Sequence, residues 1–120
     1  MTWDDADLEA LLPLQPATFH ILLSLAADER HGYGIMQEVE ARTHGALRLS
    51  AGTLYTAIHR LLGQGLIVER RRPAGPAVDP RRRYYGITPF GTAVARAEAR
   101  RLTQLVRMAR GAGLLAPEPS

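Results

Sequence analysis

Residues 49–72, with the sequence LSAGTLYTAIHRLLGQGLIVERRR, decide the fold that we predict for this chain. Ser50 is a favourable helix N-cap, because its hydroxyl oxygen can accept a hydrogen bond from a backbone N–H of the first turn. Apolar residues then recur at helical spacing, at Leu54, Ile58, Leu61 and Leu62. Gly65 suits the left-handed position that ends such a helix, and the apolar residues 66–68 predict a strand directly after it.

The face of this helix opposite the apolar stripe is small, polar and basic. At 100° per residue it carries Thr53, Thr56, His59, Arg60 and Gly63. Such a face suits the major groove of DNA, which admits an α-helix; the alternative is a surface helix whose polar face is only solvated. A helix that leads directly into a strand with a basic end is typical of the second half of a winged helix-turn-helix.

The length and composition indicate one folded domain. The chain has 120 residues, of which 46% are hydrophobic and 22% charged, as in soluble globular proteins. It has no cysteine, which excludes disulfides and thiolate metal sites. No apolar run approaches the length of a membrane span, and residues 1–10 are acidic, which argues against a secretory signal. We therefore expect a cytoplasmic protein with no membrane partner.

Positive charge is concentrated in one segment. All 15 basic residues are arginine, and the net charge is +3. Seven arginines lie between positions 60 and 83, against two acidic residues, Glu69 and Asp79. A basic segment of this kind is typical of a protein that binds a polyanion such as nucleic acid. The alternative is a solvated charge run without a partner.

The predicted elements divide the chain into four parts. Residues 1–15 form an acidic N-terminal segment with a short helix over residues 3–11. Residues 16–88 form the winged helix-turn-helix domain, residues 89–110 a C-terminal dimerisation helix, and residues 111–120 a disordered tail. The predicted fold class is mostly α with a small β-hairpin.

Two helices precede the helix that Ser50 caps, which is the predicted recognition helix. The first is predicted from Pro16, which suits a first helical position, to about Ala27. The second is predicted from Tyr33 to Thr43, after a turn over residues 28–32. Helix, short turn and helix is the order of a helix-turn-helix domain.

Two strands and a loop form the predicted wing. Strands over residues 66–68 and 81–87 pair as an antiparallel hairpin, and residues 73–80 between them contain three prolines, which exclude a central strand. Arginines at 70–72 and 81–83 flank this loop. We expect them to reach phosphates or a narrow minor groove.

The C-terminal helix is predicted to need a partner. Thr88 is a favourable N-cap and Pro89 a favourable first residue. Its apolar stripe comprises Phe90, Val94, Ala97, Leu102, Leu105, Val106 and Ala109. Homodimerisation would cover this stripe, and the alternative is that the helix folds back on the core of its own chain.

Short motifs are spread over residues 16–110 at a specific combined spacing. They are His31-Gly32-Tyr33-Gly34-Ile35, Gly52-Thr53-Leu54-Tyr55, Leu61-Leu62, Gly65-Leu66-Ile67, Tyr84-Tyr85 and Ile87-Thr88 with Gly91. With these motifs the chain resembles the PadR family of bacterial transcriptional regulators, in particular its short subfamily with a single C-terminal helix. The resemblance implies a homodimeric repressor that binds double-stranded DNA at a pseudo-palindromic operator. In some members a small aromatic effector near the dimer interface releases the DNA.

The predicted site residues come from the helices and the wing. Those expected to bind DNA are Tyr33, Ser50, Gly52, Thr53, Tyr55, Thr56, His59, Arg60, Arg81, Arg82 and Arg83. Ser50 and the first-turn N–H groups suit a phosphate, whereas Tyr55 is assigned equally to the core or to the DNA backbone. The expected dimer interface comprises Trp3, Leu8, Phe90, Val94, Ala97, Leu102, Leu105, Val106 and Ala109.

An enzyme is a poor interpretation of this sequence. The four histidines show no metal-ligand spacing, and no nucleophile with a base and no carboxylate pair converge. We therefore predict no catalytic residue, no metal and no cofactor. The main alternative is a winged-helix module for protein–protein interaction, which could lose Thr56 and Arg60 without loss of function. RNA binding is a third interpretation, for which Tyr84-Tyr85 is the only aromatic platform.

Overall fold

The computed structural model describes residues 3–71 and 82–119. The helices are α1 (Asp5–Glu9), α2 (Pro16–Ala27), α3 (Gly32–Arg42), α4 (Ala51–Gly63) and α5 (Pro89–Gly111), and the strands are β1 (Arg30–His31), β2 (Ile67–Arg70) and β3 (Tyr84–Ile87). This mostly helical chain with a small antiparallel sheet confirms the predicted fold class. Within the described ranges, no helix combines the length and apolar composition needed to cross a membrane.

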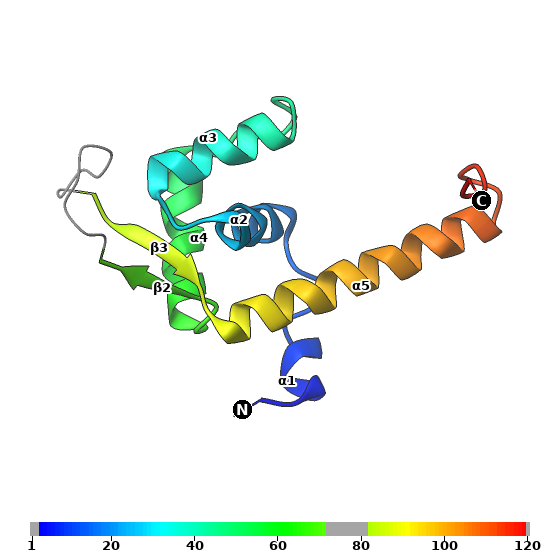
Figure 1. Cartoon of the computed structure of the whole chain (residues 1–120), viewed down its shortest axis with the longest axis horizontal. Coiled ribbons are helices and arrows are strands. Elements are labelled where there is room, and N and C mark those ends of the chain that lie inside the picture. The colour runs from blue at the N-terminus through cyan, green and yellow to red at the C-terminus, as the bar shows by residue number, and fades with distance from the viewer. Residues whose placement is uncertain (1–2, 72–81, 120) are drawn as a thin grey trace.

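The helices pack around α2. It contacts α3, α5 and β3, and Figure 1 shows it in the middle of the molecule, between α3 and α5. The most deeply buried apolar side chains include Ile21, Leu22, Ile35, Leu54, Leu61, Leu66 and Ile67. The last four come from residues 49–72. Because burial of apolar surface drives folding, that stretch contributes strongly to the core.

Both ends of α4 have the predicted caps. The Ser50 hydroxyl oxygen accepts a hydrogen bond from the Thr53 backbone N–H at 3.1 Å. After the helix, Gly65 adopts a φ of +73°, and the Leu66 N–H donates to the Leu61 carbonyl at 3.0 Å. This is how a left-handed residue pairs the last carbonyls of a helix. The predictions for Ser50 and Gly65 are confirmed.

The sheet has a third strand where the sequence predicts a turn. β3 lies between β1 and β2 and is antiparallel to both. In β1, Arg30 pairs with Tyr85 and His31 with Tyr84. Two residues are too few to show an alternating pattern, so nothing local marks this strand. The predicted antiparallel hairpin of β2 and β3 is confirmed, whereas the prediction of a turn is wrong at residues 30 and 31, which form β1.

The wing strands are present with different bounds. β2 continues to Arg70, whereas the sequence predicts a strand over residues 66–68, and β3 starts at Tyr84 rather than at position 81. The predicted loop over residues 73–80 lies outside the described residues, as does Arg81. The described part of the wing is therefore its base.

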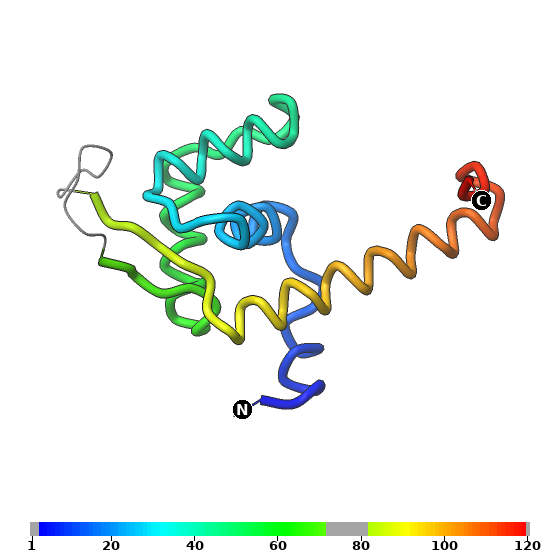
Figure 2. Tube along the Cα trace, viewed as in Figure 1, coloured from blue at the N-terminus to red at the C-terminus, as the bar shows by residue number. Residues whose placement is uncertain are grey.

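α5 has a packed half and an exposed half. It begins as predicted, with the Thr88 hydroxyl oxygen accepting from the Gly91 N–H at 2.9 Å and with Pro89 in the first turn. Val94 and Glu98 in the first half are buried. Residues 103–108 are all exposed, and Figure 2 shows this end of the helix extending away from the other elements.

The chain turns back after α5, where the sequence predicts a disordered tail. Gly113 has a φ of +79°, and the Leu114 N–H donates to the Ala109 carbonyl at 2.9 Å. The Arg110 Nε donates to the Ala116 carbonyl at 3.1 Å. These hydrogen bonds place residues 114–116 against the end of the helix.

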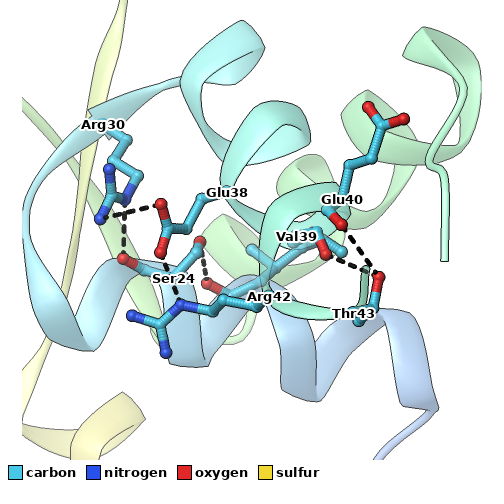
Figure 3. Close-up of polar contacts among 8 residues, drawn as sticks. Ser24, Arg30, Glu38, Val39, Glu40, Arg42 and Thr43 are labelled. Carbon is cyan, nitrogen blue, oxygen red and sulfur yellow. Dashed lines mark hydrogen bonds and ion pairs between the residues drawn. The ribbon is translucent and has the colours of Figure 1, made fainter. Parts of the chain in front are cut away.

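Polar contacts hold α3 against α2 and β1. The Arg30 Nε donates to the Ser24 carbonyl near the end of α2 at 2.9 Å, and its Nη2 lies 3.7 Å from the Glu38 carboxylate on α3. Glu38 also accepts from the Arg42 Nε at 2.6 Å, as Figure 3 shows. The hydrogen bond from Arg42, supported by the charge of Arg30, lowers the pKa of Glu38. This network fixes the direction in which α3 leaves β1.

Gly91 allows α5 to start close to the end of α4. A Cβ at this position would clash with the Leu66 carbonyl oxygen and would lie 2.9 Å from the Ile87 side chain. A backbone oxygen cannot move aside as the end of a flexible side chain can. Thr88 adds a hydrogen bond from its hydroxyl to the Gly65 carbonyl at 2.6 Å, so the two helices are joined directly at this point.

A buried carboxylate joins the N-terminal segment to α5. Glu98 is 2% exposed, and its Oε2 accepts from the Leu14 N–H at 2.9 Å. The Arg101 Nη2 lies 3.1 Å from the same oxygen. The hydrogen bond from Arg101, supported by that from Leu14, lowers the pKa of Glu98 below its ordinary value of 4.5. A buried charge is tolerated because it is paired in this way.

We predict that Glu98→Gln lowers the free energy of unfolding by about 1–3 kcal/mol at pH 7, because hydrogen bonds to a charged group are lost. The pKa of Glu98 is lower in the folded than in the unfolded chain. Its stabilisation is therefore complete above about pH 4.5 and is lost as the pH falls through the folded-state pKa. Urea unfolding of both proteins across this range, at one protomer concentration, measures the difference.

Glu118→Gln is the matched control for this experiment. The Glu118 side chain is 76% exposed and pairs with Arg110 at 3.4 Å, and an exposed pair of this kind contributes little to stability. A difference between wild type and Glu98→Gln that stays constant on acidification would contradict the assigned role of the Glu98 charge.

Candidate nucleic-acid interface

α4 presents a polar face to solvent. Leu54, Ile58 and Leu61 are at most 2% exposed on its inner side. The exposed residues on the other side include Thr53, Thr56, His59, Arg60 and Gly63. This face offers hydroxyls, an imidazole and a guanidinium, all of which can hydrogen-bond to base edges or phosphates.

The first turn of α4 is accessible to a ligand. Ser50 is exposed, and its hydroxyl donates to the Thr53 Oγ1 at 3.0 Å in addition to its capping role. A Cβ on Gly52 would meet no described atom within 4 Å. Packing within this chain therefore does not require the glycine. The space beside it lets an anion approach the N–H groups of the helix N-terminus.

A groove lies between α3, α4 and the base of the wing. Its volume is about 290 Å³, and it is lined by His31, Gly32, Tyr33, Tyr55, Arg82, Arg83 and Tyr85. Tyr55 belongs to α4 and precedes Thr56, so the groove adjoins the polar face of that helix. Tyrosine hydroxyls and guanidiniums can both donate to phosphate oxygens.

Tyr55 lies at the surface rather than in the core. Its side chain is 51% exposed, and its ring passes beside Gly32 at the start of α3. A Cβ on residue 32 would lie 2.8 Å from the Tyr55 Cζ and would clash with the hydroxyl. Gly32 therefore makes room for Tyr55 in the groove that Tyr33, 54% exposed, also lines.

Arg82 lies against two aromatic rings in the groove. Its guanidinium carbon is 5.7 Å from the centre of the Tyr33 ring, and its Nη1 is 3.1 and 2.9 Å from the two ring nitrogens of His31. The sequence predicts Tyr33 and Arg82 as site residues but not His31. The only available signal for His31 is its place in the motif that opens α3.

Two other wing arginines have carboxylate partners. Arg83 lies 3.5 Å from Glu69, and Arg70 lies 3.2 Å from Glu29. The side chains of Arg83 and Glu69 are 79% and 52% exposed, and exposed pairs contribute little energy. An arginine in such an exposed pair can therefore leave its carboxylate partner and bind a phosphate at a small cost in free energy. Of the predicted residues 81–83, the structure describes Arg82 and Arg83.

The predicted dimer-interface residues fall into different environments. Leu8 and Val94 are 8% and 0% exposed within their own chain. Both side chains pack in the core of their own chain, and their role in a dimer interface stays a prediction. Leu105 and Val106 are 47% and 39% exposed. The remaining predicted residues are half-buried: Trp3, Phe90, Ala97, Leu102 and Ala109.

Comparisons with known proteins agree with this geometry. Residues 21–97 match the model of the transcriptional regulator PadR-like family. The chain is also 43% identical, over 89 residues, to a transcriptional regulator of Mycobacterium tuberculosis. The match covers 73% of this chain and 77% of that protein.

Solved structures share the fold at low identity. A transcriptional regulator from Clostridium thermocellum is similar with a TM-score of 0.67 and 21% identity, over 91% of this chain and 96% of that one. The Bacillus subtilis PadR protein in complex with operator DNA is similar with a TM-score of 0.58 and 20% identity. That match covers 71% of this chain and 47% of the Bacillus protein, so this chain spans about half of that protein.

Proposed function

Since the chain belongs to the PadR-like family of transcriptional regulators, which are not enzymes, we propose that it represses transcription by binding a pseudo-palindromic DNA operator as a homodimer. The observation that carries the proposal is the exposed polar face of α4 beside the groove of Tyr33, Tyr55 and Arg82. The relative from Bacillus subtilis that shares the fold is itself bound to operator DNA.

We assign base contacts to the outer face of α4 and phosphate contacts to its surroundings. Thr53, Thr56, His59 and Arg60 carry the donors and acceptors that can reach base edges. The first turn of α4, the two tyrosines and the wing arginines contact phosphates. Phosphate contacts supply affinity and its salt dependence, and base contacts supply sequence preference.

Substitution of Arg60 tests the assignment of base contacts to the outer face of α4. Arg60→Ala should weaken operator binding by about 1–3 kcal/mol and reduce the preference for the operator, as expected for an arginine that reads a guanine. Fluorescence anisotropy of the DNA upstream of the chain's own gene, against a scrambled duplex and across a salt series, measures both effects. Arg96→Ala removes an exposed arginine from α5 and serves as the control.

The outcomes separate the competing functions. If Arg60→Ala weakens binding to the operator and to the scrambled duplex equally, Arg60 contacts a phosphate rather than a base. Unchanged binding by Arg60→Ala would contradict the assigned face. If wild type prefers no duplex, including candidate operators elsewhere in the genome, the protein-interaction module becomes the better interpretation.

The exposed half of α5 supports the homodimer. Leu105, Val106 and Met108 are 47%, 39% and 66% exposed, although apolar side chains at helical spacing are ordinarily covered. The alternative that the helix folds back on its own core does not hold for residues 103–108, which are all exposed. A second copy offers the same apolar face, as a two-fold interface requires.

We predict that Leu105→Asp shifts the dimer to monomer. An unpaired carboxylate in a desolvated interface should raise the dissociation constant by about a hundredfold or more. Sedimentation velocity over a concentration series measures the change, with Thr103→Asp, on the opposite side of the same helix, as the control. A wild-type monomer, or a Leu105→Asp dimer of unchanged affinity, would contradict the dimer.

A cavity beside α1 supports release by a small aromatic effector. It has a volume of about 540 Å³ and is lined by Trp3, Asp7, Ala10, Leu11, Gln64 and Phe90. The ring centroids of Trp3 and Phe90 are 5.2 Å apart, with 52° between the planes, so the two rings pack on each other and together offer an aromatic surface to a ligand in the cavity. Gln64 is also the C-cap residue of α4. A ligand that contacts Gln64 would therefore contact the end of the recognition helix.

Trp3 provides a direct measurement of this binding, since it is the only tryptophan in the chain. We predict that phenolic acids quench its fluorescence with saturation, and that the same concentrations weaken operator binding. Phe90→Leu should raise the concentration needed for both effects, because one stacking surface is lost. Quenching without saturation, or unaffected by Phe90→Leu, would exclude this cavity as the effector site.

A further inference from the structure

We infer that His31 is a positioning residue that holds Arg82 in the DNA-facing groove. The inference rests on the proposed function and assigns to His31 an action through another side chain. Its support is the place of His31 in the sheet, the position of Arg82 over the imidazole ring, and the hydrogen bond that fixes that ring.

β1 brings His31 next to the base of the wing. His31 pairs with Tyr84 in the register of β1 and β3. Their rings meet edge to face, with centroids 5.4 Å apart and planes at 75°. Arg82 precedes Tyr84 by two residues, so its side chain is within reach of the imidazole. The strand that the sequence does not predict therefore creates this contact.

The guanidinium of Arg82 lies over the face of the His31 ring. Its Nη1 is 3.1 Å from Nδ1 and 2.9 Å from Nε2. The hydrogen-bonding directions of the two ring nitrogens lie in the ring plane and diverge. A single atom in the ring plane therefore cannot hydrogen-bond to both ring nitrogens. Because the Arg82 Nη1 is close to both of them, it lies above the plane of the ring. The contact is a cation–π arrangement.

Tyr33 extends the same surface. Its ring is almost parallel to that of His31, with 4° between the planes and 6.5 Å between the centroids. Arg82 thus lies near two rings at the start of α3. A long side chain that is already ordered loses less conformational entropy when it binds a phosphate. The two rings therefore order the Arg82 side chain and lower the entropic cost of its binding to a DNA phosphate.

α3 sets the orientation of the His31 ring. The Nδ1 atom accepts a hydrogen bond from the Gly34 N–H at 2.9 Å, which caps the helix. This hydrogen bond assigns the proton of the neutral ring to Nε2. The in-plane position at Nδ1 is thus used by α3, and the ring face is used by Arg82. One side chain links the helix-turn-helix to the wing.

Two substitutions separate the cap from the ring surface. His31→Asn keeps an oxygen that can cap α3 but removes the ring, whereas His31→Phe keeps a ring but removes the cap. We expect His31→Asn to weaken operator binding about two- to fivefold, the scale of an exposed cation–π contact. His31→Phe should bind as wild type, at a temperature where it is folded, although its melting temperature falls.

His44→Asn is the control, at the other end of α3. Residue 44 has a φ of +52°, which asparagine tolerates, so this variant should bind operator as wild type does. If His31→Phe binds as weakly as His31→Asn, the helix cap rather than the ring accounts for the effect, and the inference is wrong.

A double-mutant cycle with Arg82→Gln measures the coupling directly. His31→Asn should weaken binding when Arg82 is present and should have no further effect when Arg82 is replaced. The salt slope of His31→Asn should also approach that of Arg82→Gln, because both lose the same phosphate contact. Equal effects of His31→Asn in the two backgrounds would overturn the inference.

A measurement on the free protein separates this inference from the proposed function. Ring currents should shift the NMR signal of the Arg82 Nε–H, which is identified by its loss in Arg82→Gln. His31→Asn should remove most of that shift and His31→Phe should keep it. If wild type prefers no duplex but the shift depends on residue 31, the proposed function fails while the positioning of Arg82 stands. A signal that His31→Asn leaves unchanged overturns the positioning itself.

Discussion

The pairing of β3 with both of its neighbours fixes the relative positions of three helices. β1 leads directly into α3, β2 follows α4, and β3 leads into α5 through the Thr88 cap. Neighbouring strands lie about 4.8 Å apart. His31 pairs with Tyr84 and Ile67 with Ile87, so the start of α3 is held at the first residue of β3, whereas at the other end of β3 the end of α4 converges on the start of α5. The absence of a side chain at Gly91 permits this convergence, because any Cβ there would meet the Leu66 backbone.

The features that the sequence predicts correctly are those that depend on a few neighbouring residues. Ser50 and Thr88 cap their helices because each hydroxyl reaches an N–H three residues later. The outer face of α4 is exposed because helical spacing alone separates it from Leu54 and Ile58. Contacts between distant residues leave no such signal. Glu98 meets Leu14 across 84 residues, and His31 meets Arg82 across 51.

Periodicity also identifies an apolar stripe without saying what covers it. The stripe of α5 reads as one surface in the sequence, yet Val94 lies in the chain's own core while Leu105 is exposed. The difference arises because α1 and α2 cover only the first half of the helix, and their position depends on tertiary packing. The same limit applies to the arginines. Charge density predicts a basic wing, but the pairing of Arg83 with Glu69 and of Arg70 with Glu29 appears only when the strands are paired.

In the proposed dimer, the division of α5 determines how the two recognition helices are placed. The exposed half would meet the partner, and the packed half is fastened to its own domain by Glu98 and by the contact at Gly91. A helix of 23 residues is about 34 Å long and stiff, so any rotation at the fastened end is carried to the other subunit. Recognition helices must lie about one DNA turn apart to reach two half-sites. The Trp3–Phe90 cavity, which we propose as the effector site, lies at this fastened end, so a ligand bound there would change the half-site spacing of the proposed dimer without touching DNA.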